Sequence, residues 1–181
     1  MLTPPYSSAM AVKRIFLAPG ASGSIKQLAS HAAGLTARGL SVEMVSLPKG
    51  SAERAIPAYV TALGDDAATS AIGGQSFGGR VASLIAPELR PAALVLFAYP
   101  LHAPGRHEAW VERTAHWPRI TCPVLLLSGE SDPFARIDLL SKAVLQLPNA
   151  RLVTYPGVGH GVGRVLDAAL DEVASFIGAN T

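Results

Sequence analysis

Residues 70–79 read SAIGGQSFGG, in which a short apolar run turns through glycines into a helical pattern. The segment from Gly74 to Gly78 matches G-x-S-x-G, with Ser76 at its centre. A serine on a sharp strand-to-helix turn has a strained backbone, and side chains two residues before or after it would collide with the neighbouring strand and helix. Glycines remove those side chains. We therefore expect a strand over residues 70–73, the turn at Ser76 and a helix over residues 77–85.

The same alternation of apolar runs and helical patterns extends along the chain in both directions. The runs are apolar throughout, which is typical of strands covered on both faces. Six strands alternating with helices predict an α/β fold with a mostly parallel, doubly wound sheet and helices on both faces. In such a sheet, function lies in the loops at the carboxyl ends of the strands. The expected strands are residues 14–18, 41–47, 70–73, 93–99, 124–128 and 151–155, and the other expected helices are residues 25–38, 51–63, 137–147 and 165–177.

Length and composition favour one globular domain. Of 181 residues, 49% are hydrophobic and 15% charged, so disorder over most of the chain is not expected. We expect a flexible tail over residues 1–10, with Met10 as an alternative start to Met1, and a single domain over residues 11–181. The only cysteine, Cys122, precludes an internal disulfide and is expected to be a buried, inert thiol.

Charge and hydropathy limit the partners. The net charge is +2 and the arginines are scattered, which argues against nucleic acid; we interpret each arginine as a solvated surface charge. No apolar stretch approaches 18 residues, and the N-terminus lacks the apolar region of a signal peptide, so we expect no membrane association and a cytoplasmic protein. An unpaired strand at the sheet edge could join a second copy, so a homodimer stays open.

Three polar residues follow three different expected strands. Ser76 follows the third strand, Asp132 the fifth and His160 the sixth, in the chain order Ser, Asp, His that this arrangement requires. Glu130 is the fallback acid. Taken singly, each residue has another interpretation: Ser76 could lie in a glycine-rich turn without chemistry, Asp132 could form an Asx turn or a helix cap, and His160 could be an ordinary loop histidine. A phosphate-binding loop is disfavoured because Arg80 stands where Lys-Ser or Lys-Thr would follow the glycines.

Together, these residues predict nucleophilic catalysis. His160 would take the proton of Ser76 as the serine attacks a carbonyl, and Asp132 would orient the imidazole, giving an acyl-enzyme that water hydrolyses. The oxyanion would be bound by the backbone N–H of Phe77 and by that of Ala21 in the loop after the first strand. No cofactor is expected.

Four stretches carry a resemblance to a known family: GQSFGGR (74–80), YPLHAPGR (99–106), RTAHW (113–117) and GESDPF (129–134). Over about residues 12–177, the chain resembles the small α/β hydrolases related to dienelactone hydrolase, and more closely the KANSL3/Tex30-like group of short predicted hydrolases. The resemblance implies a minimal, capless α/β-hydrolase fold. Many relatives have His-Gly where this chain has Pro19-Gly20, and some look like scaffold subunits.

The segment over residues 100–121 is too short for a full cap and could hold one short helix at about residues 107–116. We expect the substrate pocket to include Tyr99, Leu101, His102 and Trp110. Trp110 and Trp117 would share a helix face, as an apolar lid or, in the favoured interpretation, as packing against the sheet.

The remaining histidines fit no metal signature, so no metal site is expected. His102, His107 and His116 are interpreted as surface residues or as supports of the site, and His31 as a helix-surface residue.

The sequence thus predicts a serine hydrolase of a small soluble ester, lactone or acyl compound. One alternative is a non-catalytic interaction module or scaffold on the same fold. The other is an acyl-transfer or peptide-bond enzyme that uses the same three side chains.

Overall fold

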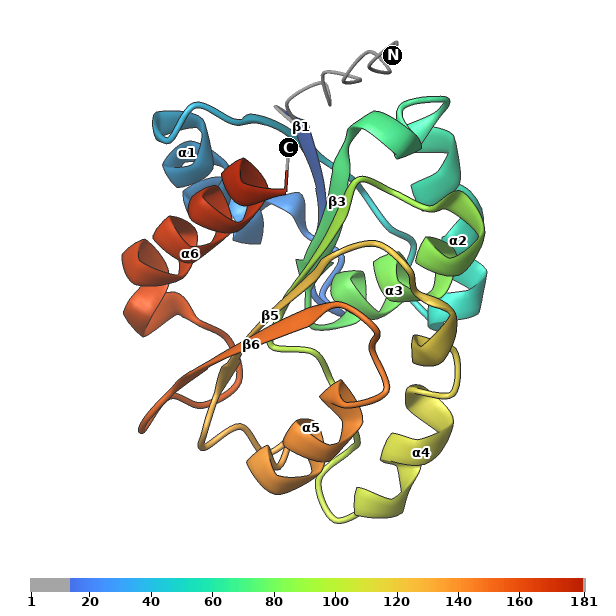
Figure 1. Cartoon of the computed structure of the whole chain (residues 1–181), viewed down its shortest axis with the longest axis vertical. Helices are drawn as coiled ribbons and strands as arrows, with labels where there is room; N and C mark the ends of the chain where they lie inside the picture. The colour runs from blue at the N-terminus through green and yellow to red at the C-terminus, as the bar shows by residue number, and fades with distance from the viewer. Residues whose placement is uncertain (1–13, 181) are drawn as a thin grey trace, which may run out of the picture.

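Six parallel strands form one sheet in the computed structural model, which describes residues 14–180 (Figure 1). The strand order is β2-β1-β3-β4-β5-β6, and every neighbouring pair is parallel, so the predicted α/β fold is confirmed. The predicted tail, both candidate start methionines and residues 11–13 of the predicted domain lie outside the described residues. The strands are β1 (Arg14–Ala18), β2 (Ser41–Met44), β3 (Ala71–Gln75), β4 (Ala93–Phe97), β5 (Val124–Gly129) and β6 (Ala150–Tyr155).

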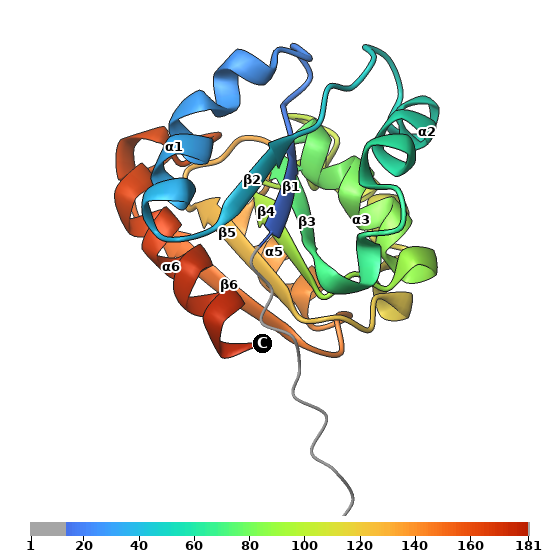
Figure 2. The same ribbon diagram turned by 90° about the horizontal axis from the view of Figure 1, so that it is seen from above.

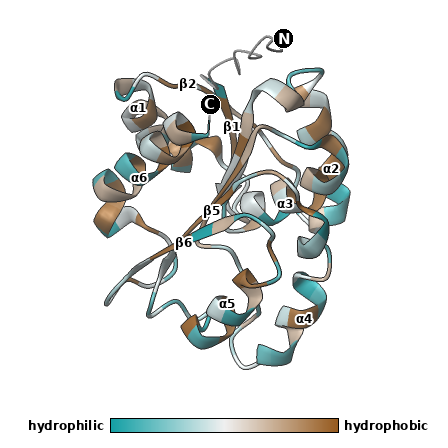
Figure 3. Ribbon diagram, viewed as in Figure 1, coloured by the Kyte–Doolittle hydropathy of each residue, from teal (hydrophilic) through white to brown (hydrophobic). Residues whose placement is uncertain are grey.

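Helices cover both faces of the sheet (Figure 2). One face packs against α1 and α6, and the other against α2, α3 and α5, so the sheet lies between two apolar clusters. The colouring of Figure 3 shows the apolar residues concentrated along the strands and on the helix faces turned towards them. The α-helices are α1 (Ala29–Ala37), α2 (Ala52–Leu63), α3 (Phe77–Leu89), α4 (Trp110–Arg113), α5 (Ile137–Val144) and α6 (Leu166–Ala179).

Several predicted bounds differ from those of the structure. The strand expected over residues 41–47 ends at Met44, because β2 is an edge strand that pairs only with β1 and is largely exposed. The helix expected to end at residue 85 continues to Leu89 through Pro87, and Arg90 closes it in the left-handed conformation at φ 47°. The single helix expected over residues 107–116 is two short pieces, η3 (His107–Ala109) and α4.

Two sequence predictions about single buried groups have opposite outcomes. Cys122 is buried as predicted, and burial raises the pKa of its thiol to about 11, which keeps it protonated and unreactive. His31 is not on the helix surface. It is only 6% exposed, because α1 packs against both the sheet and its neighbour α6, and the His31 ring meets the Phe97 ring edge-on at 5.2 Å. Burial lowers the pKa of His31.

The side chain of Tyr59 joins two strands directly below the turn at Ser76. Its hydroxyl oxygen lies 2.8 Å from the carbonyl oxygens of Phe16 in β1 and Gly73 in β3, and it accepts the N–H of Gly73 at 3.0 Å. Tyr59 is fully buried, so these backbone groups have no access to water. The hydroxyl therefore satisfies backbone groups where β1 and β3 approach the turn.

We predict that Tyr59→Phe lowers the free energy of unfolding by about 1–3 kcal/mol, because it leaves buried backbone groups without a partner. Urea unfolding measures the change. Tyr155→Phe is the matched control, because the Tyr155 hydroxyl is buried and accepts or donates no hydrogen bond within residues 14–180. An equal loss in both variants would contradict the role given to the Tyr59 hydroxyl.

Candidate active site

The loops at the carboxyl ends of all six strands meet at one edge of the parallel sheet. Ser76 directly follows β3, Asp132 follows β5, and His160 follows β6. Asp132 and His160 are held together by their loops, because the N–H of Ser131 donates to the carbonyl of Val158 at 2.9 Å. Residues that are far apart in the sequence are therefore brought to one place by strand order alone.

The structure brings the three predicted catalytic side chains into one hydrogen-bonded chain. His160 Nε2 lies 2.9 Å from Ser76 Oγ, and His160 Nδ1 lies 2.8 Å and 3.0 Å from the two carboxylate oxygens of Asp132. The Asp132 side chain is fully buried, whereas that of His160 is 26% exposed. This geometry places a carboxylate behind the imidazole and leaves the serine end open to solvent.

Phe134 supports both members of the Asp132–His160 pair. Its backbone N–H donates to Asp132 Oδ1 at 2.8 Å, and its ring lies against the His160 ring with centroids 4.6 Å apart. Glu130, the fallback acid, is instead exposed and accepts a hydrogen bond from Thr154 Oγ1. Asp132 is thus the carboxylate that contacts His160.

Ser76 has the strained conformation expected from its glycine-rich surroundings. Its φ of 49° and ψ of −112° are rare for a residue with a side chain. A Cβ on Gly74 or Gly78 would collide with the backbone carbonyl of Ala18, and one on Gly79 would come within 3.0 Å of the Gly74 carbonyl. These glycines let β1, β3 and α3 meet closely enough to hold the turn.

Two residues that line the pocket have a backbone N–H without an acceptor among residues 14–180. Neither the N–H of Phe77 nor that of Ala21 has a hydrogen-bond partner in the part of the chain that the structure describes. Phe77 begins α3, where helix geometry leaves N–H groups unpaired, and Ala21 lies in the turn after β1. Both residues line the same pocket as Ser76 and His160. Each is a hydrogen-bond donor without a partner at the pocket, and the predicted oxyanion role of both stays a prediction.

The pocket has a volume of about 730 Å³, which suits a small molecule. One wall comes from the loops after β1 and β2 and from the start of α2, and the opposite wall comes from the segment between β4 and β5. The lining residues are Gly20, Ala21, Ser22, Gln27, Gly50, Ser51, Ala52, Glu53, Gln75, Ser76, Phe77, Arg80, Pro100, Ala103, Arg106, Ala109, Glu112, Arg113, Phe134 and His160.

The four residues predicted for the pocket wall do not line it. Tyr99, Leu101 and His102 are buried beneath the pocket, and Trp110 packs against the apolar core. The chain turns sharply here, so Tyr99 and Leu101 point to the core while Pro100 between them faces the pocket. The favoured interpretation of the tryptophans as packing residues is confirmed, since Trp117 is fully buried against Tyr99.

Two of the remaining histidines support the site from below. His102 Nε2 accepts the backbone N–H of Arg136, and the backbone N–H of His102 donates to the carbonyl of Phe134, so His102 ties the β4 loop to the loop that carries Asp132. His116 Nε2 lies 2.9 Å from Ser83 Oγ on α3. Burial lowers the pKa of His116 to about 4, and the positive charge of Arg80 adds to this shift. Within residues 14–180, no three potential metal ligands cluster together.

Sequence reasoning missed the charged lining of the pocket. Arg80, interpreted as a solvated surface charge, is only 20% exposed in its side chain and pairs with Glu53 at 3.2 Å. The sequence spacing of Arg80 from Ser76 indicates this position, because a residue four positions after Ser76 lies on the same helix face, one turn further along. Arg113 could not be recognised in this way, since its distance from the serine depends on how the loop folds.

Comparison with known proteins identifies the family. Residues 49–164 match the family described as Alpha/beta hydrolase domain. The chain belongs to this family. No curated protein matches the sequence. The coarse family prediction is therefore confirmed, while the narrower resemblance to the dienelactone hydrolase and KANSL3/Tex30-like groups stays a prediction.

Solved structures show the same α/β-hydrolase fold at low sequence identity. A monoacylglycerol lipase from Paleococcus ferrophilus is 12% identical with a TM-score of 0.81, covering 93% of this chain and 95% of that one. A predicted CIB-like hydrolase from Thermoplasma acidophilum is 19% identical with a TM-score of 0.72, covering 94% and 88%. An enol-lactonase from Burkholderia xenovorans is 15% identical with a TM-score of 0.71, covering 92% and 91%. Among the described residues of this α/β hydrolase, every helix is too short or too polar to cross a membrane.

We predict that Gly78→Ala destabilises the protein by about 2–3 kcal/mol, because the new Cβ would collide with the Ala18 backbone. Thermal unfolding measures the loss. Gly178→Ala in α6 is the matched control, because its Cβ meets nothing within 4 Å, and the change should stabilise the helix by about 0.5–1 kcal/mol. A Gly78→Ala protein as stable as the wild type would mean that β1 and α3 can move apart.

We predict that His116 makes folding stability depend on pH. Unfolded His116 takes up a proton as the pH falls below about 6.5, whereas the folded protein keeps it neutral down to about 4, so its contribution is present above 6.5 and lost between these values. His116→Gln keeps a polar partner for Ser83 but cannot titrate. Urea unfolding at pH 7 and 4.5 should show the wild type losing about 2 kcal/mol more than the variant. Equal losses would contradict a buried, neutral His116.

Proposed function

We propose that this α/β hydrolase is a serine hydrolase of small carboxyl esters, lactones or related acyl compounds. One observation carries the proposal: Ser76 Oγ, His160 and the buried carboxylate of Asp132 form a continuous hydrogen-bonded chain at a pocket. A glycine turn without chemistry would not require a serine at φ 49° with an imidazole 2.9 Å from its hydroxyl.

The first half of the reaction forms an acyl-enzyme. Ser76 Oγ attacks the substrate carbonyl carbon while His160 Nε2 accepts the hydroxyl proton. The N–H groups of Phe77 and Ala21 stabilise the negative charge on the carbonyl oxygen. Asp132 stabilises the imidazolium that forms. The tetrahedral intermediate then collapses, the bond to the leaving alcohol breaks, and the alcohol takes the proton from His160.

The second half returns the enzyme to its starting state. His160 Nε2 accepts a proton from water as the water oxygen attacks the acyl carbon, and the proton passes to Ser76 Oγ as the acid leaves. Solvent exposure of the His160 side chain favours water as this second nucleophile over another acyl acceptor. The alternative of an amide-cleaving or acyl-transferring enzyme lacks an observation of its own.

Pocket size and composition support a small substrate. A volume of about 730 Å³ is lined by polar and charged groups as well as apolar ones. We expect p-nitrophenyl acetate or butyrate to be hydrolysed more efficiently than the palmitate. The narrower kinship with dienelactone-hydrolase-like proteins, and a cytoplasmic location, belong to the same proposal.

We predict one covalent adduct when the protein reacts with a fluorophosphonate, detected by intact mass, and none for Ser76→Ala. Asp132→Asn should slow labelling about a thousandfold or more, because the imidazole loses its orienting carboxylate. Glu130→Gln is the matched control and should label at the wild-type rate, since Glu130 bonds Thr154 and not His160. No adduct on folded wild-type protein would favour the non-catalytic interaction module instead.

A further inference from the structure

Three guanidinium groups line the pocket that contains Ser76. Arg80 comes from α3, Arg113 from α4, and Arg106 from the loop between β4 and η3. Two carboxylates, Glu53 and Glu112, line it as well. These five lining residues together carry one net positive charge. A pocket of this kind favours a substrate with one negative charge.

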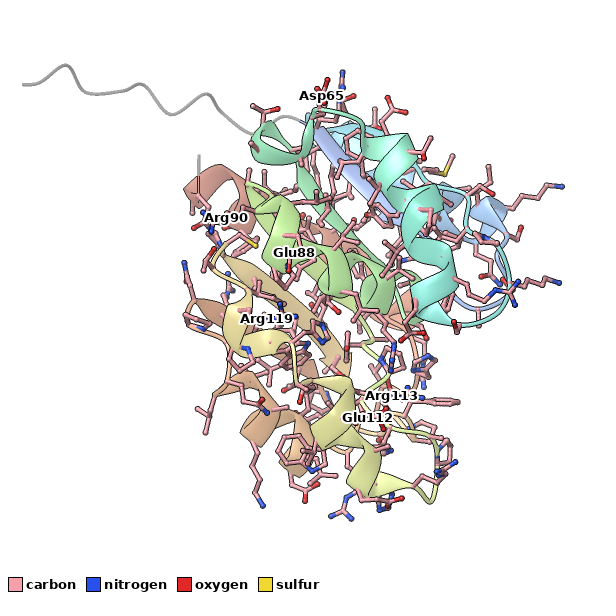
Figure 4. The ribbon with its side chains drawn as sticks, turned by 90° about the vertical axis from the view of Figure 1, so that its right-hand side faces the viewer. Asp65, Glu88, Arg90, Glu112, Arg113 and Arg119 are labelled. Carbon is pink, nitrogen blue, oxygen red and sulfur yellow. The ribbon has the colours of Figure 1, made fainter. Side chains whose placement is uncertain are left out.

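Arg113 is a partly buried cation without an ion pair. Its Nη1 donates to the carbonyl of Pro100 at 2.8 Å, and the Tyr99 hydroxyl donates to its own backbone carbonyl at 3.0 Å, so both ends of the residue are fixed. In residues 14–180, no carboxylate oxygen lies within 4.0 Å of its guanidinium, although Glu112 is its chain neighbour on α4 (Figure 4). The other N–H groups of the guanidinium are therefore available to a ligand.

Neighbouring cations make this position unfavourable when the pocket holds no anion. Burial and the positive charge of Arg80 lower the pKa of Arg113, and the charge of Arg106 adds to the effect, while Tyr99 and Glu112 partly oppose it. The three arginines line one pocket, so their positive charges repel one another there. The negative charge of a ligand would remove this repulsion.

Arg80 is positioned relative to the reacting atoms by the helix itself. Its backbone N–H donates to the carbonyl of Ser76 at 3.0 Å, which places it one helical turn beyond the serine, a rise of about 6 Å. Its side chain is held by Glu53 at 3.2 Å. Both Ser76 and the Arg80 side chain line the same pocket, so a ligand there can contact both.

Arg119 shows what an ordinary surface arginine looks like in this protein. Its side chain is 64% exposed, pairs with Glu88 at 3.2 Å, and lies outside the pocket lining. Figure 4 shows Arg119 beside Glu88 on α3, well separated from Arg113 and Glu112 on α4. Arg119 is exposed and already has a counter-ion, whereas Arg113 is partly buried in the pocket and has none within 4.0 Å among residues 14–180.

We propose that the pocket selects esters that carry a carboxylate group, bound by the guanidinium groups of Arg80 and Arg113 and placed a few carbons from the reacting carbonyl. This inference deepens the proposed function and rests on it. The planar guanidinium matches a carboxylate through two parallel hydrogen bonds. One carboxylate would neutralise the net positive charge of the five charged residues that line the pocket.

The test compares substrates that differ only in the carboxylate. The p-nitrophenyl monoester of adipic acid, which carries the charge on the acyl side, is compared with the neutral p-nitrophenyl hexanoate. The acetate ester of 6-hydroxyhexanoate, which carries the charge on the leaving group, is compared with the neutral hexyl acetate. In at least one pair, the wild type should have a kcat/KM for the charged ester about tenfold or more above that of the neutral one. The preference should fall as salt is added, because the pocket is open to solvent.

Variants assign the preference to named side chains. Arg113→Gln should bring the ratio of charged to neutral kcat/KM close to one, Arg113→Lys should retain part of it, and Arg119→Gln should leave it at the wild-type value. Glu53→Gln should raise the ratio, because Glu53 competes with the substrate for Arg80. Circular dichroism checks that each variant is folded. The wild-type ratio needs no variant, so the proposal can fail even if Arg113→Gln does not fold.

The outcomes separate this inference from the proposed function. Turnover that requires Ser76 but shows no preference for either charged ester would overturn the carboxylate site and leave the serine hydrolase standing. If no turnover or fluorophosphonate adduct depends on Ser76, the proposed function fails, and calorimetric binding of monomethyl adipate, a monoanion, to Ser76→Ala decides the carboxylate site. Binding that Arg113→Gln weakens about tenfold would support the site. Absence of monomethyl adipate binding would overturn it.

Discussion

The close approach of the β1 and α3 backbones is the constraint on which the rest of the site depends. The Ala18 carbonyl lies where a Cβ on Gly74 or Gly78 would be, so this contact exists only with glycine at both positions. It forces the chain from β3 into α3 within one residue, and Ser76 takes the resulting strain at φ 49°. Such strain persists only where surrounding structure imposes it. Here Ser76 N–H is also held by the Phe97 carbonyl at 2.8 Å, and Tyr59 satisfies the backbone just below.

Parallel strands turn this one strained residue into a site. Because every strand of the sheet runs in the same direction, the loops after β5 and β6 open at the edge where Ser76 lies. Asp132 is buried and its oxygens are occupied by Phe134 N–H and by the imidazole, so its position is determined from both sides. His102 then ties this loop to the segment after β4. The polar groups are thus positioned by contacts beneath the pocket.

The segment between β4 and β5 adds a charged pocket wall to the parallel sheet and its covering helices. It is too short to form a cap, yet it supplies one wall of the pocket through Pro100, Ala103 and the two arginines Arg106 and Arg113. Trp117 and Tyr99 anchor it to the apolar core with rings 5.1 Å apart. Large apolar side chains therefore hold the wall in place, and charged ones give it its chemistry. In this way a minimal domain can present a charged pocket without an additional domain.

The sequence by itself determined the strand and helix alternation, the glycine turn and the identity of the three residues that meet at it. These features depend on nearby residues or on the order of the elements along the chain. Glycine is required where another backbone atom lies within 3.0 Å of the position that a Cβ would occupy, and the order of the strands limits which loops can lie at the same edge of the sheet. Only the tertiary structure decided which side chains of the β4–β5 segment face the pocket, replacing Tyr99, Leu101 and His102 with Pro100 and Arg113. It also decided that His31 is buried. The physical reason is that the burial of a loop or a short helix depends on the surfaces that pack against it. Those surfaces come from distant parts of the chain, and their contacts produce no periodic pattern in the local sequence.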